Sequence, residues 1–269
     1  MQRWSVHSNG CDISYEIRGD GVPVVLIQGV GVCGSAWRPQ VDRLSQCYTC
    51  MTFDNRGIGA SQPAGRLVSI PQMAEDVLAL MDARSWYSAH LIGHSMGGLI
   101  ALQAAMNEPK RVRTLSLICA FARGADATRI SAKMAWMGMR TRVGRKSWRR
   151  RAFLRLLSPP GTLPADLISL GNRVSELFGH DIAEQPPVVI KQLAAMRNHD
   201  LTARLGELAG IRTLVVSARH DVIAPPSSGK VIAAGIPGAH YVEVADASHG
   251  VTILDADGVN ALLLNHLAG

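Results

Sequence analysis

The sequence has no apolar run long enough to cross a membrane, and its first residues lack the apolar core of a secretory signal peptide. Its five cysteines are an odd number scattered along the chain, so a disulfide framework is not expected. Cys47 and Cys50 form a lone close pair, which we interpret as the edge of a strand, with a redox or zinc role second. We therefore expect a cytoplasmic protein without stable membrane insertion.

Charged residues make up only 18% of the chain. Residues 140–155 contain no Asp or Glu. Eight cations in that segment account for the formal net charge of +7, which would be −1 without them. We interpret them as a solvated helix face, and attraction of an anionic substrate or membrane surface is the second interpretation. Nucleic acid is not an expected partner, because no aromatic residues alternate with the cations. The cations are Arg140, Arg142, Arg145, Lys146, Arg149, Arg150, Arg151 and Arg155.

Short apolar strands alternate with helical stretches over the 269 residues, which suffice for one large α/β domain. Residues 22–27 are a continuous apolar run, typical of a strand that is buried on both faces of a parallel sheet. The pattern predicts a mostly parallel, doubly wound sheet of about eight strands. We expect the strands at residues 3–6, 13–17, 22–27, 48–53, 89–92, 114–119, 213–217 and 241–245.

The alternation stops between residues 122 and 205, where helical stretches are separated by glycine and proline and no strand pattern occurs. We predict a helical lid here, inserted after the sixth strand, between core segments 1–121 and 206–269. Such an insertion would lie over the carboxyl edge of the sheet, where folds of this class bind ligands. Among its apolar residues, we expect Trp136 and Met137 to line a substrate pocket, and ordinary packing onto the core is the alternative.

The most informative stretch is Gly93-His94-Ser95-Met96-Gly97, between a predicted strand and a predicted helix. It matches a nucleophile elbow, in which a serine on a strained turn lifts its hydroxyl clear of the sheet. A side chain at position 93 or 97 would collide with neighbouring backbone in so sharp a turn. Ser95 is thus the candidate nucleophile, and we expect the elbow to aim His94 away from it.

A serine hydroxyl needs an adjacent base, and that base needs a carboxylate to orient it. His249 follows the last predicted strand, and Asp221 follows the strand before it, so both fall on the same sheet edge as Ser95. Asp246 is the rival acid, although its closeness to His249 is more typical of a turn residue. The chain order serine, aspartate, histidine is that of α/β-hydrolases.

The chain thus resembles an α/β-hydrolase fold enzyme of the lid-bearing esterase and lactonase type, over nearly its whole length. The resemblance implies an oxyanion hole formed by the backbone N–H groups of Val30 and Met96. Gln28 stands where the family usually has a histidine at the start of the first glycine-rich loop. We also expect Gln28 to line the substrate pocket. No metal or organic cofactor is implied, and no cluster of histidine, cysteine and carboxylate has ligand spacing.

The expected reaction is hydrolysis of a carboxylic ester or lactone through an acyl-enzyme, with a small substrate whose acyl part is apolar. Carbon–carbon bond hydrolysis or cofactor-free perhydrolysis on the same triad is the alternative. A ligand-binding protein that keeps the fold without turnover is a third hypothesis. A homodimer is left open.

Overall fold

Eight strands form a single sheet in the order β1-β2-β4-β3-β5-β6-β7-β8 in the computed structural model, which describes residues 2–65, 67–127, 139–141 and 143–269. The pairs β1–β2 and β2–β4 are antiparallel, and all remaining pairs are parallel. The predicted mostly parallel sheet of about eight strands is confirmed. The strands are β1 (Arg3–Ser8), β2 (Cys11–Arg18), β3 (Val22–Ile27), β4 (Tyr48–Phe53), β5 (Ala89–His94), β6 (Val112–Ile118), β7 (Arg212–Ala218) and β8 (His240–Val244).

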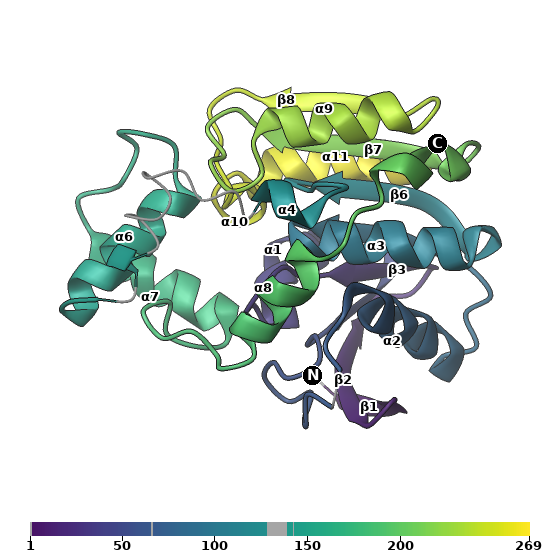
Figure 1. Ribbon diagram of the computed structural model, residues 1–269, viewed down its shortest axis with the longest axis horizontal. Coiled ribbons are helices and arrows are strands. Elements are labelled where there is room, and N and C mark those ends of the chain that lie inside the picture. Colours follow the sequence, from purple (N-terminus) through teal and green to yellow (C-terminus); the bar gives the residue numbers. More distant parts are fainter. Residues whose placement is uncertain (1, 66, 128–138, 142) are drawn as a thin grey trace.

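The middle of the sheet is apolar because helices cover both of its faces. On one face, α2 (Ile70–Ala83) packs against α3 (Met96–Asn107), and on the other α1 (Arg38–Leu44) packs against α11 (Ala256–Ala268) (Figure 1). All six residues of β5 are buried, and β5 lies between β3 and β6. The strand that leads to Ser95 is thus at the centre of the sheet. The remaining core elements are η1 (Gly34–Trp37), η2 (Pro109–Arg111), α9 (Pro226–Gly235) and α10 (Val251–Leu254).

Between β6 and β7, the described residues contain helices and no strand. The helices α6 and α7 stand off the carboxyl ends of the strands (Figure 1), and an isolated bridge pairs Arg123 with Asp200, near the two ends of the segment. The predicted boundaries of a lid at 122 and 205 remain a prediction. The elements of this segment are α4 (Gly124–Ala127), α6 (Lys146–Leu157), α7 (Leu167–Phe178), α8 (Val189–Arg197) and η3 (Thr202–Leu208).

A buried ion pair fixes the turn that follows β4. Arg56, which is 1% exposed, donates from Nη2 and Nε to the two carboxylate oxygens of Asp76 in α2, at 2.6 and 2.8 Å. Ser8 also donates to Asp76, at 2.6 Å, so the buried carboxylate is fully satisfied. Such a pair must be complete, because a lone buried charge is strongly destabilising. It joins the β4 turn, β1 and α2.

The cations between residues 140 and 155 are divided between ion pairs and solvent. Arg150 and Lys146 both contact the Asp181 carboxylate, at 2.6 and 2.7 Å. The hydrogen bond from Arg150 keeps the pKa of Asp181 far below its usual range. Arg151 and Arg155 are exposed on α6, as a solvated helix face requires. Arg142 lies outside the described residues.

All five cysteines are free thiols. Cys47 is exposed just before β4, whereas Cys50 is buried inside that strand, where burial raises the pKa of its thiol to about 12. None of the described helices combines the length and apolar character that a membrane span requires.

His90 in β5 makes stability depend on pH. Its Nδ1 lies 2.8 Å from Thr114 Oγ1, and burial lowers its pKa from 6.5 to about 4. Below pH 6.5 the unfolded chain therefore binds a proton that the native protein does not, so stability falls as the pH falls toward 4. At pH 5 this loss is about 2 kcal/mol for one histidine.

We expect urea unfolding to show a loss of stability between pH 7.5 and pH 5 that is smaller by about 2 kcal/mol in His90→Gln. His240→Gln, which replaces an exposed histidine in β8, is the control and should leave the loss unchanged. Equal losses in His90→Gln and the wild type would contradict the assignment.

Candidate active site

Ser95 lies on a strained turn between β5 and α3. Its φ is +56° and its ψ is −123°, a conformation that residues other than glycine rarely adopt. Its N–H donates to Ile118 O in the neighbouring strand, at 3.0 Å, which ties the turn to β6. A Cβ at Gly93 would lie 2.4 Å from Gly97 O, and one at Gly97 would lie 2.1 Å from Ile27 O. Both positions therefore require glycine, as the sequence predicted.

Ser95, His249 and Asp221 form one hydrogen-bonded line. The Ser95 hydroxyl lies 3.0 Å from His249 Nε2, and His249 Nδ1–H donates to Asp221 Oδ2 at 2.7 Å. All three residues are less than 10% exposed. They follow β5, β8 and β7, and the carboxyl ends of these parallel strands meet at one edge of the sheet. The structure thus brings together three residues that are distant in sequence.

The Asp221 carboxylate is held in its charged form. Burial works against the charge, but the charge and hydrogen bond of His249 and two backbone N–H groups outweigh burial, so the pKa of Asp221 is below its usual value. Those backbone donors are Ile223 and Ala224, which contact Oδ1 at 2.8 and 2.9 Å. Oδ2 is thus left for His249. Asp246, the rival acid, is exposed and makes no hydrogen bond to His249.

Two backbone N–H groups stand beside Ser95 without a hydrogen-bond partner among the described residues. They belong to Val30, in the loop after β3, and Met96, the first residue of α3. The loop is close to Ser95, since a Cβ at Gly29 would lie 3.1 Å from Ser95 Cβ. The positive end of the α3 dipole also points here. These are the two donors that the resemblance implied.

Gln28 helps to hold the loop after β3 in place, through its side chain and its backbone carbonyl. Its Oε1 accepts from Gly29 N at 3.2 Å, and its own carbonyl accepts from Asn55 Nδ2 at 2.9 Å. Its side chain is 2% exposed and lines the pocket next to Ser95. No pattern in the sequence predicted the contact of Asn55, because it joins loops at the ends of two different strands.

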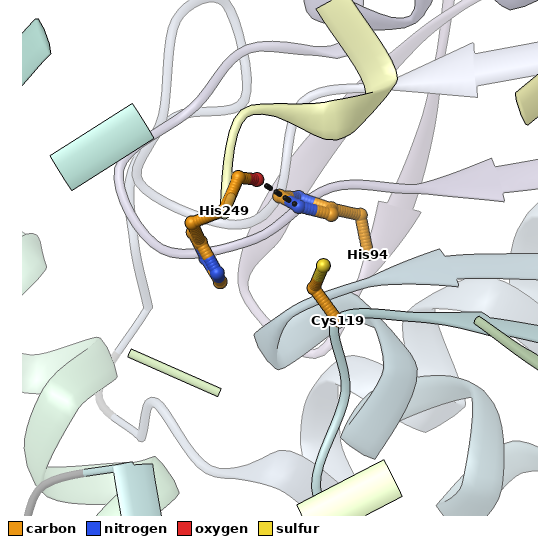
Figure 2. Close-up of side chains that lie close together, drawn as sticks. All are labelled: His94, Cys119 and His249. Atoms are coloured by element: carbon orange, nitrogen blue, oxygen red, sulfur yellow. Dashed lines mark hydrogen bonds between the residues drawn. The ribbon is translucent and has the colours of Figure 1, made fainter. Parts of the chain in front are cut away.

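Among the described residues no hydrogen bond joins His94 to Ser95, but His94 contacts His249, which is the residue that Ser95 bonds to. The Nε2–H of His94 donates to His249 O at 3.0 Å, and the two imidazole centroids are 4.9 Å apart (Figure 2). Burial and the nearby His249 lower the pKa of His94 to about 3, so it stays neutral. His94 thus holds the backbone of His249. In the sequence, only its position next to Ser95 indicated that His94 lies close to the site.

The side chains of His94, Cys119 and His249 are the described group that offers metal-ligand atoms, all within 4.8 Å of one another (Figure 2). Most of their donor atoms already serve other contacts, and of the two His94 nitrogens only Nε2 has a hydrogen-bond partner among the described residues. Both His249 nitrogens serve Ser95 and Asp221, and His94 Nε2 serves a carbonyl. Burial and the Asp221 charge raise the pKa of the Cys119 thiol well above its usual value, and metals bind the thiolate. We therefore assign this group to hydrogen bonding.

A cavity of about 260 Å³ opens onto Ser95 and His249. Its wall is mostly aliphatic and aromatic, and none of its described lining residues is Asp, Glu, Lys or Arg. Gln28 lies in this wall, while Trp136 and Met137, which were expected beside it, lie outside the described residues. The helices between β6 and β7 contribute Phe153, Leu156, Leu157, Phe178, Val189, Leu193 and Met196.

A family model described as the alpha/beta hydrolase fold matches residues 22–256. The chain belongs to the alpha/beta hydrolase family. This match includes the Ser95 turn and the loops that carry Asp221 and His249. The resemblance drawn from the sequence is thereby confirmed.

Related alpha/beta hydrolases carry several activity names. The chain is 29% identical to a candidate carbamate hydrolase named RutD from Azorhizobium caulinodans, over 96% of each chain. The enol-lactonase from Burkholderia xenovorans superposes with a TM-score of 0.81 at 27% identity, covering 98% of this chain and 100% of that one. BpoC, a candidate non-heme bromoperoxidase from Mycobacterium tuberculosis, gives 0.80 at 28% identity, covering 95% of each. Hydrolysis is the activity that the family, the carbamate hydrolase relatives and the enol-lactonase support.

Proposed function

We propose that this protein is a serine hydrolase that cleaves neutral carboxylic esters or lactones through an acyl-enzyme. Ser95 Oγ attacks the carbonyl carbon while His249 Nε2 takes the hydroxyl proton. The N–H groups of Val30 and Met96 bind the oxyanion of the tetrahedral intermediate. His249 then protonates the leaving alkoxide, and a water molecule, activated by the same imidazole, releases the acid and restores Ser95.

The observation that carries this proposal is the hydrogen-bonded line from Ser95 through His249 to Asp221. The carboxylate keeps Nδ1 protonated, so Nε2 is the nitrogen that is free to accept the serine proton. It also stabilises the imidazolium that forms during attack. Burial strengthens both effects, because charges interact more strongly away from water.

The wall of the cavity supports an uncharged substrate with an apolar acyl part. Burying a charged group without a partner is costly, and no charged side chain among the described lining residues would pair with one. A carbamate is the second candidate, since relatives bear the name RutD and the acyl-transfer steps would be the same. We also propose that residues 122–205 act as the lid, because their helices form part of the cavity wall.

A fluorophosphonate ester should react once per chain, on Ser95, and Ser95→Ala should lower kcat/KM for p-nitrophenyl butyrate by at least about 10³-fold. The reason is that the alkoxide of Ser95 forms the covalent intermediate. Mass spectrometry of the labelled protein locates the adduct, and steady-state assays measure the rate. An adduct on another residue, or undiminished turnover in Ser95→Ala, would refute the mechanism.

Asp221→Asn should lower kcat by about 10³–10⁴-fold, because an amide can donate to Nδ1 and favour the wrong tautomer. Asp246→Asn is the matched control, since Asp246 is exposed on the loop that carries His249, and its kcat should stay within twofold. Circular dichroism checks that both variants fold. The reverse ranking would identify Asp246 as the acid.

Neutral substrates should be preferred over anionic ones of similar size. We expect kcat/KM for p-nitrophenyl butyrate to exceed that for the mono-p-nitrophenyl ester of succinic acid by at least tenfold, because the second carboxylate would enter the cavity unpaired. γ-Butyrolactone and p-nitrophenyl N-ethylcarbamate extend the panel to lactones and carbamates. Faster turnover of the succinate ester would contradict the neutral-substrate proposal, and turnover of the carbamate alone would favour the second candidate.

A further inference from the structure

Two side chains from the segment between β6 and β7 hold Gly31, the residue directly after Val30. Gln192 Oε1 in α8 accepts from Gly31 N–H at 2.9 Å. His180, which follows α7, donates from Nε2 to Gly31 O at 2.7 Å. The backbone on both sides of this one residue is therefore anchored outside the sheet, in a part of the chain about 150 residues away.

The Gln28–Gly29 peptide, earlier in the same loop, is held by residues of the core. As described above, Asn55 holds Gln28 O and the Gln28 side chain holds Gly29 N–H. Between these anchors and those on Gly31 lies the peptide that carries the Val30 N–H, which has no partner among the described residues. Its neighbours are thus fixed on both sides, while its own donor stays free for a ligand.

The contact with α8 is close and buried. Gly31 has φ +76°, and a Cβ there would lie 2.9 Å from Val189 Cγ2, so only glycine lets the loop approach the helix. Gln192 is 0% exposed, and its Nε2 has no partner among the described residues. A buried amide whose only hydrogen bond is accepted from Gly31 is hard to explain by packing alone, because an aliphatic side chain would fill the same space without the unpaired donor.

The orientation of His180 is fixed as well. Its Nδ1 lies 2.9 Å from Asp181 O and its Nε2 lies 2.7 Å from Gly31 O, so a neutral ring donates to Gly31 O only in its Nε2–H tautomer, whereas the imidazolium donates to both carbonyls. Asp181 itself is held by Arg150 through two hydrogen bonds, at 2.9 and 2.6 Å. The loop after β3 is thus connected through His180 and its chain neighbour Asp181 to Arg150 in α6.

We propose that Gln192 and His180 are positioning residues that set the Val30 N–H at the distance an oxyanion requires. The inference rests on the proposed serine-hydrolase function and deepens it. The helical segment then affects the rate of acyl transfer, in addition to forming a wall of the pocket. An oxyanion donor must lie about 2.7–3.1 Å from the developing charge, and displacement by about 1 Å can cost about 10²-fold in rate. Supporting residues of this kind act through the groups they hold.

The test compares Gln192→Met, which keeps the volume but removes the acceptor, with Gln192→Glu, which keeps an acceptor oxygen in the same place. We expect kcat for p-nitrophenyl butyrate to fall about 10–100-fold in Gln192→Met while KM changes by less than about threefold, because the oxyanion forms only after attack. Gln192→Glu should recover part of the loss, relative to the wild type at the same pH, when the assay pH is low enough to protonate the buried carboxyl group, because an unpaired charge there would itself be destabilising. Lys191→Met, on the exposed side of the same helix, is the control and should match the wild type.

A second pair of variants tests His180. His180→Phe keeps a ring without a donor, and should lower kcat as Gln192→Met does, whereas His180→Gln can still donate to Gly31 O and should keep more activity. A trifluoromethyl ketone, which Ser95 would convert to a tetrahedral adduct with an oxyanion, should bind each low-kcat variant more weakly in proportion to its loss of kcat. Active-site titration with the fluorophosphonate counts folded, reactive protein, so partial misfolding does not distort kcat.

Three outcomes would overturn the inference while leaving the proposed function intact. These are a kcat of Gln192→Met and His180→Phe within twofold of Lys191→Met, a rise in KM alone, or a ketone affinity that does not follow kcat. A lower melting temperature with unchanged kcat per titrated site would likewise assign both residues to stability. Failure of the proposed function looks different, because the wild type would then show no adduct on Ser95, and the positioning role would fall with it.

Discussion

The positive φ of Ser95 is the constraint on which the rest of the site depends. A serine in that conformation is strained, and the strain persists because the surrounding backbone leaves no alternative path. Gly93 and Gly97 lie so close to neighbouring backbone that the chain can pass only without a Cβ at either position. The turn also aims the first N–H groups of α3 toward the space above the hydroxyl.

Burial gives the residues around Ser95 distinct protonation states. Asp221 stays charged because backbone N–H groups and His249 compensate for the loss of water. His94, equally buried but without a carboxylate partner, stays neutral and serves as a donor to a carbonyl. Cys119 keeps its proton because burial and the negative charge of Asp221 both raise the pKa of its thiol. Similar depth in the protein thus has opposite effects, according to which partner each side chain meets.

The helical segment between β6 and β7 contacts both loops that flank Ser95. It holds Gly31 after β3, and the carbonyl of Leu157 at the end of α6 accepts from Gly250 N–H at 2.9 Å, directly after His249. Ser248 Oγ donates to Leu156 O as well, at 3.2 Å. The last carbonyls of α6 are therefore satisfied by the loop that carries the imidazole. Because of these contacts, the position of the helical segment and the positions of the two loops beside Ser95 depend on each other.

The sequence by itself determined the order of strands and helices, the requirement for glycine on both sides of Ser95, and the placement of Asp221 after a strand at the same sheet edge as Ser95 and His249. These are local properties, because hydrophobic period, turn chemistry and the position of a residue after a strand can be read along the chain. Only the tertiary structure decided that His94 contacts His249, that Asn55 and Gln28 brace one loop, and that Gln192 reaches Gly31. Each of those contacts joins segments whose spacing in sequence has no fixed relation to their distance in space, so no pattern along the chain encodes them.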